Sequence, residues 1–413
     1  MSRTQPPGGP VSQLEATEAA LCAIIPADQI ETQYDMEQGP GGAWSIEPAS
    51  EIELVELLRW ANAKHAVVYT RRARRGDAAA CGLRPRLYLR SRRMKRIVDI
   101  DIVSGTVTVQ TGISMAELQR ELEERGFSMG FPARPWRQEP LGAVLSAALD
   151  SHWGPRYGAM EEQVVALGVV LPDGTVAHSR AAPRKAVGPD FDRLFLGSRG
   201  RFGIVFQATL RLFAHTARSA STHGAPSLAA ALSAARRVFE LGADLRAVEI
   251  LTAAPDRTWG RKRLGLSETL PVLLLVEPQG SPAGDAAELV EICINRTLTP
   301  LTAPAGWNVH EGLLPPPRAW TSPVVPASWR ELVRLAEALG SDVPAGLWIV
   351  RMSRHGGHLS LADGVDGPAA DTVRAFIEAR QAELAVGRDL SKSLEADLKR
   401  RLDPKGILNP VSR

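Results

Sequence analysis

The chain has 413 residues, which at about 150 residues per domain predicts two to three domains. Hydrophobic residues make up 44% and charged residues 23%, a globular composition that excludes a disordered chain. The 49 Lys and Arg residues nearly balance the 46 Asp and Glu residues, and a net charge of +3 with no aromatic interleaving argues against nucleic acid as a partner.

In chain order, the first half of the sequence is predicted to form a helix at 12–25, a helix after Ser50, a strand at 65–70, a hairpin from 97–102 and 106–111, a helix at 114–124, and strands at 164–171, 175–177 and 203–213. The two later helices each begin at a capping box, in which Ser precedes Glu by three residues, as in Ser50 and Glu53. Gly126 is expected to end the helix that begins at Ser114.

The second half is predicted to form a helix at 227–242, a strand at 272–276, a helix at 328–340, a strand at 347–352 continued from Leu359, and helices within 367–402. The pattern of residues changes after Phe213, and the final predicted helices differ in pattern from the segment before them. We therefore expect domain boundaries near residues 214 and 375.

The cysteines and the apolar runs bear on the compartment. Cys22, Cys81 and Cys293 are far apart and form no Cys-x-x-Cys pair, which argues against a disulfide framework, a zinc site and an iron–sulfur cluster. The apolar stretch at 19–25 follows acidic residues, unlike a signal peptide, and the run at 270–276 is too short to cross a bilayer. No transmembrane segment is expected, and the predicted location is cytoplasmic.

Common catalytic motifs are absent: the sequence contains no GxxxxGK[ST], GxGxxG, HExxH or GxSxG. The most informative segment runs from Gly188 to Val205, where Gly197, Gly200 and Gly203 recur every three residues before a predicted strand. Glycines let the backbone approach a ligand closely, and their N–H groups can face phosphate or ring carbonyl oxygens. A glycine-rich turn that simply leads into the strand is the alternative.

Several segments together resemble the vanillyl-alcohol-oxidase-like (PCMH-type) family of FAD-linked oxidoreductases. The glycine segment is similar to the family's Gly-Ser-Glu-Gly-Thr-Leu-Gly-Ile run, and the other similar segments are 93–112, 156–174 and 402–410. The resemblance covers about residues 40–213 and roughly the last 15. The middle region is most similar to that of the small FAD-binding subunit of bacterial glycolate oxidase, and the run from Pro183 to Asp190 resembles alkyl-dihydroxyacetone-phosphate synthase.

The resemblance implies an α+β fold with a two-part PCMH-type FAD-binding domain and a smaller α+β cap domain. The expected divisions are an N-terminal helix and connection at 1–40, the FAD-binding domain at 41–213, the cap or substrate domain at 214–375, and a C-terminal segment returning to the FAD domain at 376–413. By motif position, the residues implied to contact FAD are Gly76, Gly142, Gly154, Tyr157, Gly158, Gly197, Ser198, Gly200, Gly203, Ile204 and Asn409.

The sequence departs from the family where the FAD diphosphate is expected to bind. The family has a glycine-rich loop there, whereas this chain has several arginines after Thr70 and keeps only Gly76. Arginine side chains would crowd a backbone cradle, yet they can also neutralise phosphate by bidentate hydrogen bonds. Arg199 and Phe202 replace the family's Glu and Leu. A rebuilt site and a lost site both remain open, and because the loop has no His, FAD is expected to be non-covalent.

Candidate catalytic residues follow the predicted strand at 347–352. His355 and His358 flank two glycines and could act as a base and a substrate-orienting group, with Arg354 pairing a substrate carboxylate. Exposed histidines in a turn are the alternative. No third ligand accompanies the two histidines, so no metal site is predicted.

The segment from Arg71 to Arg96 contains eleven basic residues and Asp77 as its single acid. It could contact a phosphate-bearing ligand or an acidic partner subunit, and a solvated basic loop is the alternative. The chain is thus interpreted as an FAD-dependent oxidoreductase that oxidises a small hydroxy acid or alcohol by hydride transfer to flavin, as one subunit of a complex with a separate electron acceptor. The alternative is a non-catalytic homologue that has lost FAD and acts as a structural or regulatory partner.

Overall fold

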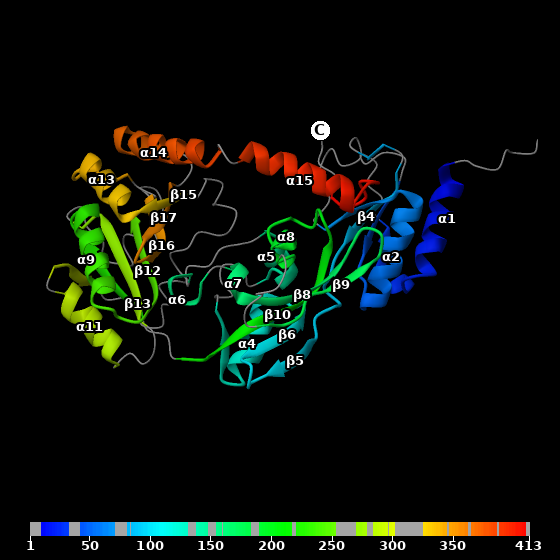
Figure 1. Cartoon of the computed structure of the whole chain (residues 1–413), viewed down its shortest axis with the longest axis horizontal. Helices are drawn as coiled ribbons and strands as arrows, with labels where there is room; N and C mark the ends of the chain where they lie inside the picture. The colour runs from blue at the N-terminus through cyan, green and yellow to red at the C-terminus, as the bar shows by residue number, and fades with distance from the viewer. Residues whose placement is uncertain are drawn as a thin grey trace, which may run out of the picture.

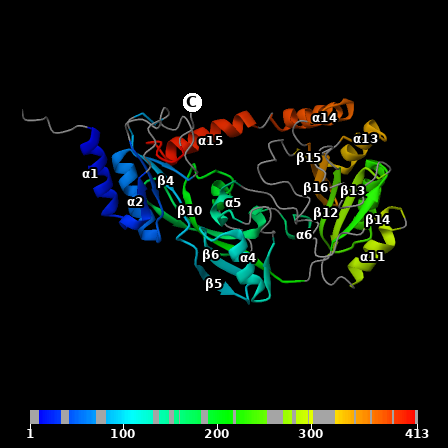
Figure 2. The ribbon, with the colours of Figure 1, turned by 180° about the vertical axis from the view of Figure 1, so that it is seen from behind.

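The computed structural model describes residues 10–32, 42–70, 81–82, 84–130, 138–147, 154–158, 160–182, 190–216, 220–252, 270–278, 284–295, 297–301, 325–344, 347–361, 365–385 and 388–409. Two bodies lie side by side in Figure 1: one contains the N-terminal elements and α15, and the other contains β11–β17 with the helices α9, α11, α13 and α14. The view from behind in Figure 2 shows the same arrangement.

The N-terminal sheet has four strands in the order β1-β2-β4-β3, and its β2–β4 and β4–β3 pairs are parallel. Its elements are α1 (Pro10–Cys22), η1 (Ala27–Gln29), β1 (Ile30–Thr32), β2 (Ala43–Ile46), α2 (Glu51–Lys64), β3 (Val67–Tyr69) and β4 (Arg86–Leu89). The α2 helix buries Leu54, Leu57 and Leu58 in a core shared with α1 and the sheet. Val68 of β3 belongs to this core, and the basic, arginine-rich segment Arg71–Arg96 begins shortly after β3.

The second sheet has six strands in the order β5-β6-β10-β8-β9, with β7 pairing β10. Its strands are β5 (Ile97–Asp101), β6 (Thr106–Gln110), β7 (Phe127–Met129), β8 (Val164–Val170), β9 (Val176–His178) and β10 (Ile204–Ala214). The helices on this part are α4 (Met115–Glu123), α5 (Leu141–Ala147), α6 (Gly154–Tyr157), α7 (Met160–Gln163) and α8 (Asp192–Phe195). The 11-residue β10 pairs with β6, β7 and β8, so it ties this sheet together.

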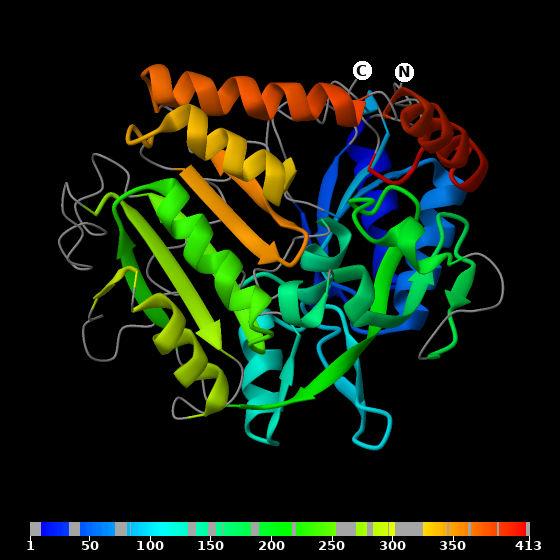
Figure 3. The same ribbon diagram turned by 60° about the vertical axis from the view of Figure 1, so that its left-hand side comes forward.

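The third sheet has seven strands in the order β14-β11-β13-β12-β16-β17-β15, and we call it the cap sheet. Its strands are β11 (Ser221–Ala225), β12 (Leu245–Thr252), β13 (Val272–Pro278), β14 (Thr299–Leu301), β15 (Val325–Ser328), β16 (Leu347–Ser353) and β17 (Gly356–Leu361). The helices α9 (Leu228–Glu240), α11 (Asp285–Ile294), α13 (Trp329–Leu339) and α14 (Pro368–Ala385) share one core with it. In Figure 3, α9, α11 and α13 lie in front of the cap sheet, on one of its faces.

The opposite face of the cap sheet is turned toward the second sheet. Val248 and Ile250 of β12 pack with the helices, so Ala247 and Glu249 point to the opposite face because side chains alternate along a strand. Ala247 packs with Tyr157 of α6, and Phe213 of β10 packs against this pair. The helix α6 packs against β12 and β16, and it therefore forms the junction between the two bodies.

The C-terminal chain returns to the first body through α15 (Arg388–Leu402), as Figures 1 and 2 show. Leu398 and Leu402 pack on the core of the second sheet, whereas Ile407 and Leu408 are buried in the core of the N-terminal sheet. A β-bridge joins Val68 to Leu408. The C-terminal segment thus contacts both halves of the first body.

The mixed α+β architecture predicted from the sequence is confirmed. The strand predicted from His65 begins instead at Val67, because His65 ends α2 in the left-handed conformation with a φ of 55°. The helix predicted over 12–25 ends at Cys22. Within the described residues, no helix is long and apolar enough to cross a membrane.

Candidate active site at the junction of the first body and the cap sheet

The loop that carries Gly197 and Ser198 closes the C-terminal end of α5. The Gly197 N–H donates to the Leu145 carbonyl at 3.0 Å, and the Arg199 N–H donates to the Ser146 carbonyl at 2.7 Å. The Ser198 hydroxyl donates to the Phe195 carbonyl at 2.8 Å. Helix C-termini leave carbonyl groups without partners inside the helix. The N–H groups of Gly197 and Arg199 supply partners for two such carbonyls of α5, so both N–H groups bind protein atoms.

The neighbouring glycines allow protein segments to approach closely. A Cβ atom on Gly203 would lie 2.7 Å from Val169 Cγ1, and one on Gly142 would lie 3.1 Å from Thr111 Oγ1. The Gly142 N–H donates to the Thr111 carbonyl at 2.8 Å. Ile204, the first residue of β10, is buried. Contacts with other protein segments therefore already favour glycine at Gly203 and Gly142.

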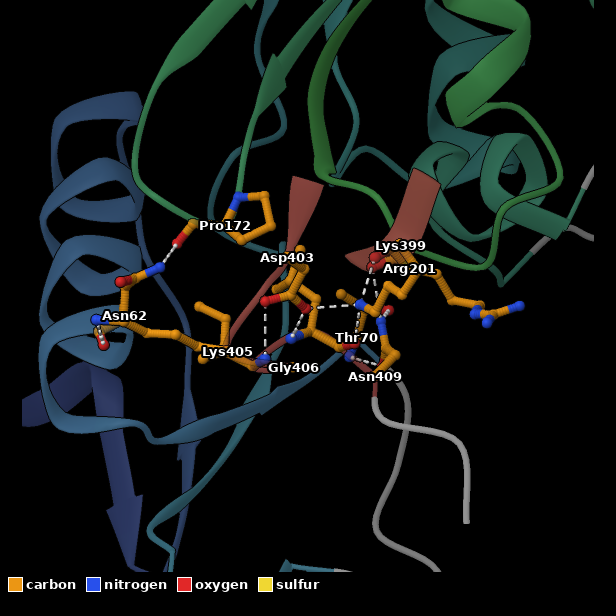
Figure 4. Close-up of polar contacts among 12 residues, drawn as sticks. Asn62, Thr70, Pro172, Arg201, Lys399, Asp403, Lys405, Gly406 and Asn409 are labelled. Atoms are coloured by element: carbon orange, nitrogen blue, oxygen red, sulfur yellow. Dashed lines mark hydrogen bonds and ion pairs between the residues drawn. The ribbon is translucent and has the colours of Figure 1, made fainter. Parts of the chain in front are cut away.

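Asn409 joins this loop to the end of β3 (Figure 4). Its Oδ1 accepts the Thr70 N–H at 3.0 Å, and its Nδ2 lies 3.0 Å from Thr70 Oγ1. The same Nδ2 donates to the carbonyls of Arg199 at 3.1 Å and Gly200 at 3.0 Å. A Cβ atom on Gly200 would lie 2.7 Å from Thr70 Oγ1, so only glycine fits this contact. Gly142, the 197–204 loop and Asn409 thus form one connected group.

Lys399 and Asp403 hold the segment that presents Asn409. Asp403 accepts the Ile407 and Leu408 N–H groups, each at 2.9 Å, and the Lys399 Nζ at 2.6 Å. Lys399 Nζ also donates to the Arg201 and Leu408 carbonyls, each at 2.6 Å. Burial lowers the pKa of Lys399 below its usual value, and the Asp403 carboxylate opposes that shift. Figure 4 shows this network beside Asn409.

Tyr157 and Gly158 belong to a second group, beside the cap sheet. The Tyr157 ring lies 4.4 Å from that of Phe213, centroid to centroid, and Gln163 Nε2 donates to the Tyr157 carbonyl. Gly154 begins α6, and Gly158 has a φ of +82° with the Glu162 carboxylate where a Cβ atom would lie. Gln163 is 1% exposed, and its Oε1 has no hydrogen-bond donor within the described part of the chain.

The face of the cap sheet opposite its helices carries polar side chains. His358 pairs with Val350 in β16, and Leu359 next to it packs with the helices. His358 therefore lies on the same face as Ala247 and Glu249, the face against which α6 packs. His358 is partly buried, and Glu249 is only 1% exposed.

The structure separates His358 from the other two predicted catalytic residues. Arg354 and His355 occupy the turn between β16 and β17, and both are exposed. The His355 N–H donates to Ser353 Oγ at 3.2 Å. The three residues therefore lie on one hairpin, with His358 in its strand and the other two at its tip.

The described part of the basic segment is partly neutralised. Arg84 donates to the carbonyls of His65, Lys405 and Gly406. Arg93 lies 3.1 Å from an Asp28 carboxylate oxygen, and further along Lys95 pairs with Glu117 at 3.3 Å. Arg92 and Arg96 are exposed. Gly76 and the arginines at 71–75 lie outside the described residues.

One buried acceptor among the described residues suits the ring end of an FAD molecule. A buried amide oxygen without a donor in this part of the structure, Gln163 Oε1, lies beside the segment that contains Tyr157 and Gly158. Such an oxygen matches the need of a flavin ring N–H for an acceptor. The first group ends at Thr70, where the segment expected to face the diphosphate starts.

Sequence reasoning missed three residues of this site. Thr70 was expected only as the end of a strand, although its position directly before the arginines was a usable signal. Gln163 and Glu249 carried no signal, because their importance depends on burial and on strand register. Both become apparent only when α6, α7 and the cap sheet are placed together.

A sequence profile described as an FAD binding domain matches residues 43–180. An uncharacterized FAD-linked oxidoreductase of Escherichia coli K12 is 31% identical over 123 residues, which is 30% of this chain and 25% of that protein. A probable mitochondrial D-lactate dehydrogenase of Danio rerio is 32% identical over 165 residues, which is 39% of this chain and 33% of that protein. The matches therefore span a quarter to a third of these relatives.

Solved structures of low sequence identity share the fold. An alkyldihydroxyacetonephosphate synthase aligns with a TM-score of 0.71 at 17% identity, covering 99% of this chain and 86% of the other. A substrate-bound p-cresol methylhydroxylase aligns with a TM-score of 0.64 at 12% identity, covering 96% of this chain and 95% of the other. These alignments include the cap sheet as well as the first body.

Proposed function

We propose that the chain, which matches an FAD binding domain over residues 43–180, is an FAD-linked oxidoreductase of the vanillyl-alcohol-oxidase-like, PCMH-type family, and that it oxidises a small hydroxy acid or alcohol. FAD is the cofactor of the matched domain, and we propose that it is held non-covalently. In this proposal, residues 41–213 and 376–413 hold the cofactor, and residues 214–375 bind the substrate.

The observation that carries the proposal is the placement of His358. The cap sheet turns the face with His358 and Glu249 toward α6, and α6 leads into Tyr157 and Gly158, which we assign to the flavin end of the site. A titratable imidazole and a buried carboxylate thus share a face that covers the proposed ring site. A substrate held between the two bodies would meet His358, with Glu249 buried on the same face.

The substrate class is suggested by one relative. The D-lactate dehydrogenase relative is named for a 2-hydroxy acid, and such a substrate offers a hydroxyl proton and a carboxylate for recognition. We assign removal of the hydroxyl proton to Nε2 of His358, because Nδ1 is buried. Arg354 lies at the exposed tip of the hairpin, away from His358, so we assign it no contact with the same substrate molecule.

The two-electron redox chemistry of the reaction would be supplied by bound FAD. The chain's own contributions are different: Gln163 Oε1 would orient the ring by accepting a hydrogen bond, and the packing of α6 against the cap sheet would exclude water. Turnover also needs an electron acceptor, and we assign contact with an acceptor or partner subunit to the basic segment Arg71–Arg96, where Arg92 and Arg96 are exposed.

The test begins with the purified full-length protein. We expect an absorbance band at about 450 nm, as for any bound flavin. Under anaerobic conditions, D-lactate or glycolate should bleach this band. Steady-state turnover is followed with dichlorophenolindophenol as the acceptor. A colourless protein that takes up no added FAD would overturn the redox proposal and leave the alternative of a non-catalytic partner protein.

The role of His358 is tested in the same assay. The variant His358→Ala should slow flavin reduction by at least about 100-fold, the range typical of a lost general base. His178→Ala is the matched control, since His178 is an exposed histidine on β9. Equal reduction rates in the two variants would remove His358 from the mechanism.

A further inference from the structure

We propose that Asn409 is a positioning residue for the cofactor: its amide holds Thr70, directly after β3, against the 197–203 loop without itself touching FAD. This role rests on the proposed function, because it concerns how the same site binds FAD. It differs from the direct contact that the sequence resemblance implied for Asn409.

The amide of Asn409 is fully used by protein atoms. A primary amide has two N–H donors and one carbonyl acceptor. Oδ1 accepts the Thr70 N–H, and Nδ2 lies 3.0 to 3.1 Å from three oxygens, namely Thr70 Oγ1 and the carbonyls of Arg199 and Gly200. With both donors committed, the side chain has no hydrogen left for a ligand.

The two segments that meet at this amide are far apart in the sequence. Thr70 follows β3 and directly precedes the arginine-rich segment, whereas Gly200 lies in the glycine loop that closes α5. Their contact is tight, because a Cβ atom on Gly200 would lie 2.7 Å from Thr70 Oγ1 and 2.9 Å from Asn409 Nδ2. Asn409 therefore fixes the distance between the two segments assigned to the cofactor.

Asn409 is itself held rigidly. Its N–H donates to the Val68 carbonyl at 2.9 Å, and the preceding residues Ile407 and Leu408 are bound by the Asp403 carboxylate. Its φ of 38° lies in the left-handed region, which Asn tolerates better than most residues. The backbone thus presents the amide in one orientation, as Figure 4 shows.

A preorganised junction improves affinity because the ligand does not have to order the two segments when it binds. Loss of the amide should therefore weaken FAD binding while the cores of both sheets remain folded. A hydrogen bond of this kind contributes about 1 to 1.5 kcal/mol, so losing the donors predicts a rise of about 10-fold in the FAD dissociation constant.

The experiment compares four variants of the full chain by FAD titration, followed by quenching of flavin fluorescence. Asn409→Asp keeps the acceptor for the Thr70 N–H but places a carboxylate oxygen against three oxygens, and Thr70→Val removes one partner without changing side-chain shape. Both should raise the FAD dissociation constant, by about 10-fold or more and about 3-fold, respectively. Thr70→Ser restores the hydroxyl and should restore wild-type affinity.

The fourth variant, Asn62→Ala, is the matched control, because Asn62 Nδ2 donates to the Pro172 carbonyl at 3.2 Å in the same body, away from the junction. It should bind FAD like the wild type. If Asn409→Asp does not fold, the contrast between Thr70→Val and Thr70→Ser decides the question. A positioning role predicts weaker FAD binding in Thr70→Val than in Thr70→Ser when the two apo-proteins have equal thermal stability. A purely structural role predicts equal FAD affinity in that case.

The outcomes separate this role from the proposed function. Wild-type protein that binds FAD, together with wild-type affinity in both Asn409→Asp and Thr70→Val, would overturn the positioning role alone. Wild-type protein that binds no FAD would overturn the proposed function and, through it, this role.

Discussion

His223 is a histidine that the fold keeps uncharged. It lies on β11, opposite Leu274 of β13, and is 2% exposed. Its Nε2 lies 3.0 Å from Ser221 Oγ, and its Nδ1 has no partner within the residues the structure describes. Burial penalises the imidazolium form and lowers the pKa of His223 from 6.5 to about 4.

This shift predicts a loss of stability in mild acid. Between pH 6.5 and pH 4, the unfolded chain binds a proton at His223 that the folded protein does not bind, so the free energy of unfolding falls as the pH falls through this window. At pH 5 the loss is at most about 2 kcal/mol. Urea unfolding at pH 5 and pH 7 measures it. His223→Gln should flatten the dependence, and an unchanged slope in that variant would refute the assignment.

Single residues also show what could be predicted from the sequence. Gly200 and Gly203 were predicted to let the backbone approach a ligand, and the structure places protein atoms, Thr70 Oγ1 and Val169 Cγ1, close to where their Cβ atoms would lie. The spacing of the glycines indicates a close approach but does not identify the neighbouring atoms. Those atoms come from Thr70, directly after β3, and from Val169 in β8, and only the packing of the sheets brings them there.

At the scale of elements, helix starts were the most predictable feature. Ser50, Ser114 and Ser328 each accept an N–H from the residue three positions later, as their capping boxes predicted. Of these three serines, only Ser328 also donates its backbone N–H to the Glu side chain three positions later. At Ser50, the Glu53 side chain accepts the Ala49 N–H instead. Local hydrogen bonding explains this success, since it involves only neighbouring residues.

The cap of α13 can be tested directly. Glu331 Oε2 accepts the Ser328 N–H at 2.7 Å and the Ser328 hydroxyl at 2.6 Å. These hydrogen bonds hold the pKa of Glu331 below its ordinary value. Ser328→Ala should lower the free energy of unfolding by about 1 kcal/mol, whereas Ser328→Gly should lower it by a few tenths, about 0.3 kcal/mol. An unchanged free energy of unfolding in Ser328→Ala, measured by chemical unfolding, would show that the side-chain cap contributes nothing.

The C-terminal segment depends on one carboxylate. Asp403 has no exposed side-chain surface, and it binds Lys399 and two backbone N–H groups. Asp403→Ala removes the charge that compensates a buried lysine, so we expect a loss of about 3 to 5 kcal/mol in unfolding free energy. The double variant Asp403→Ala with Lys399→Met should recover part of it. A double variant no more stable than Asp403→Ala would argue against a charge effect.

At the scale of the whole molecule, the sequence indicated the two kinds of body but not how they face each other. His358 was recognised from its spacing with His355, whereas Glu249 lies about a hundred residues earlier in the chain. Their common face follows from the register of β12, β16 and β17. A shift of one residue in any of these strands would turn its side chains to the helices, and a single sequence does not determine that register.

A buried ion pair links the connection between the bodies to the cap sheet. Arg246 Nη1 lies 2.9 Å from Glu277 Oε1, and Arg246 Nη2 donates to Thr216 Oγ1, just after β10. The side chains of Arg246 and Glu277 are 4% and 0% exposed. The pair therefore holds the segment that follows β10, through Thr216, against the cap sheet.

This arrangement makes the last prediction one about the two bodies together. Arg246→Met leaves the Glu277 carboxylate buried without its arginine, and we expect a loss of about 3 to 5 kcal/mol in the unfolding of the cap. Arg246→Met with Glu277→Leu should recover most of that loss, because a buried pair can be replaced by apolar side chains at little cost. Arg236→Met is the control, since Arg236 pairs with Glu240 on the exposed surface of α9. Hydrogen exchange of β12 and β13, with urea unfolding, measures the effect, and equal protection in Arg246→Met and Arg236→Met would contradict the proposed fastening.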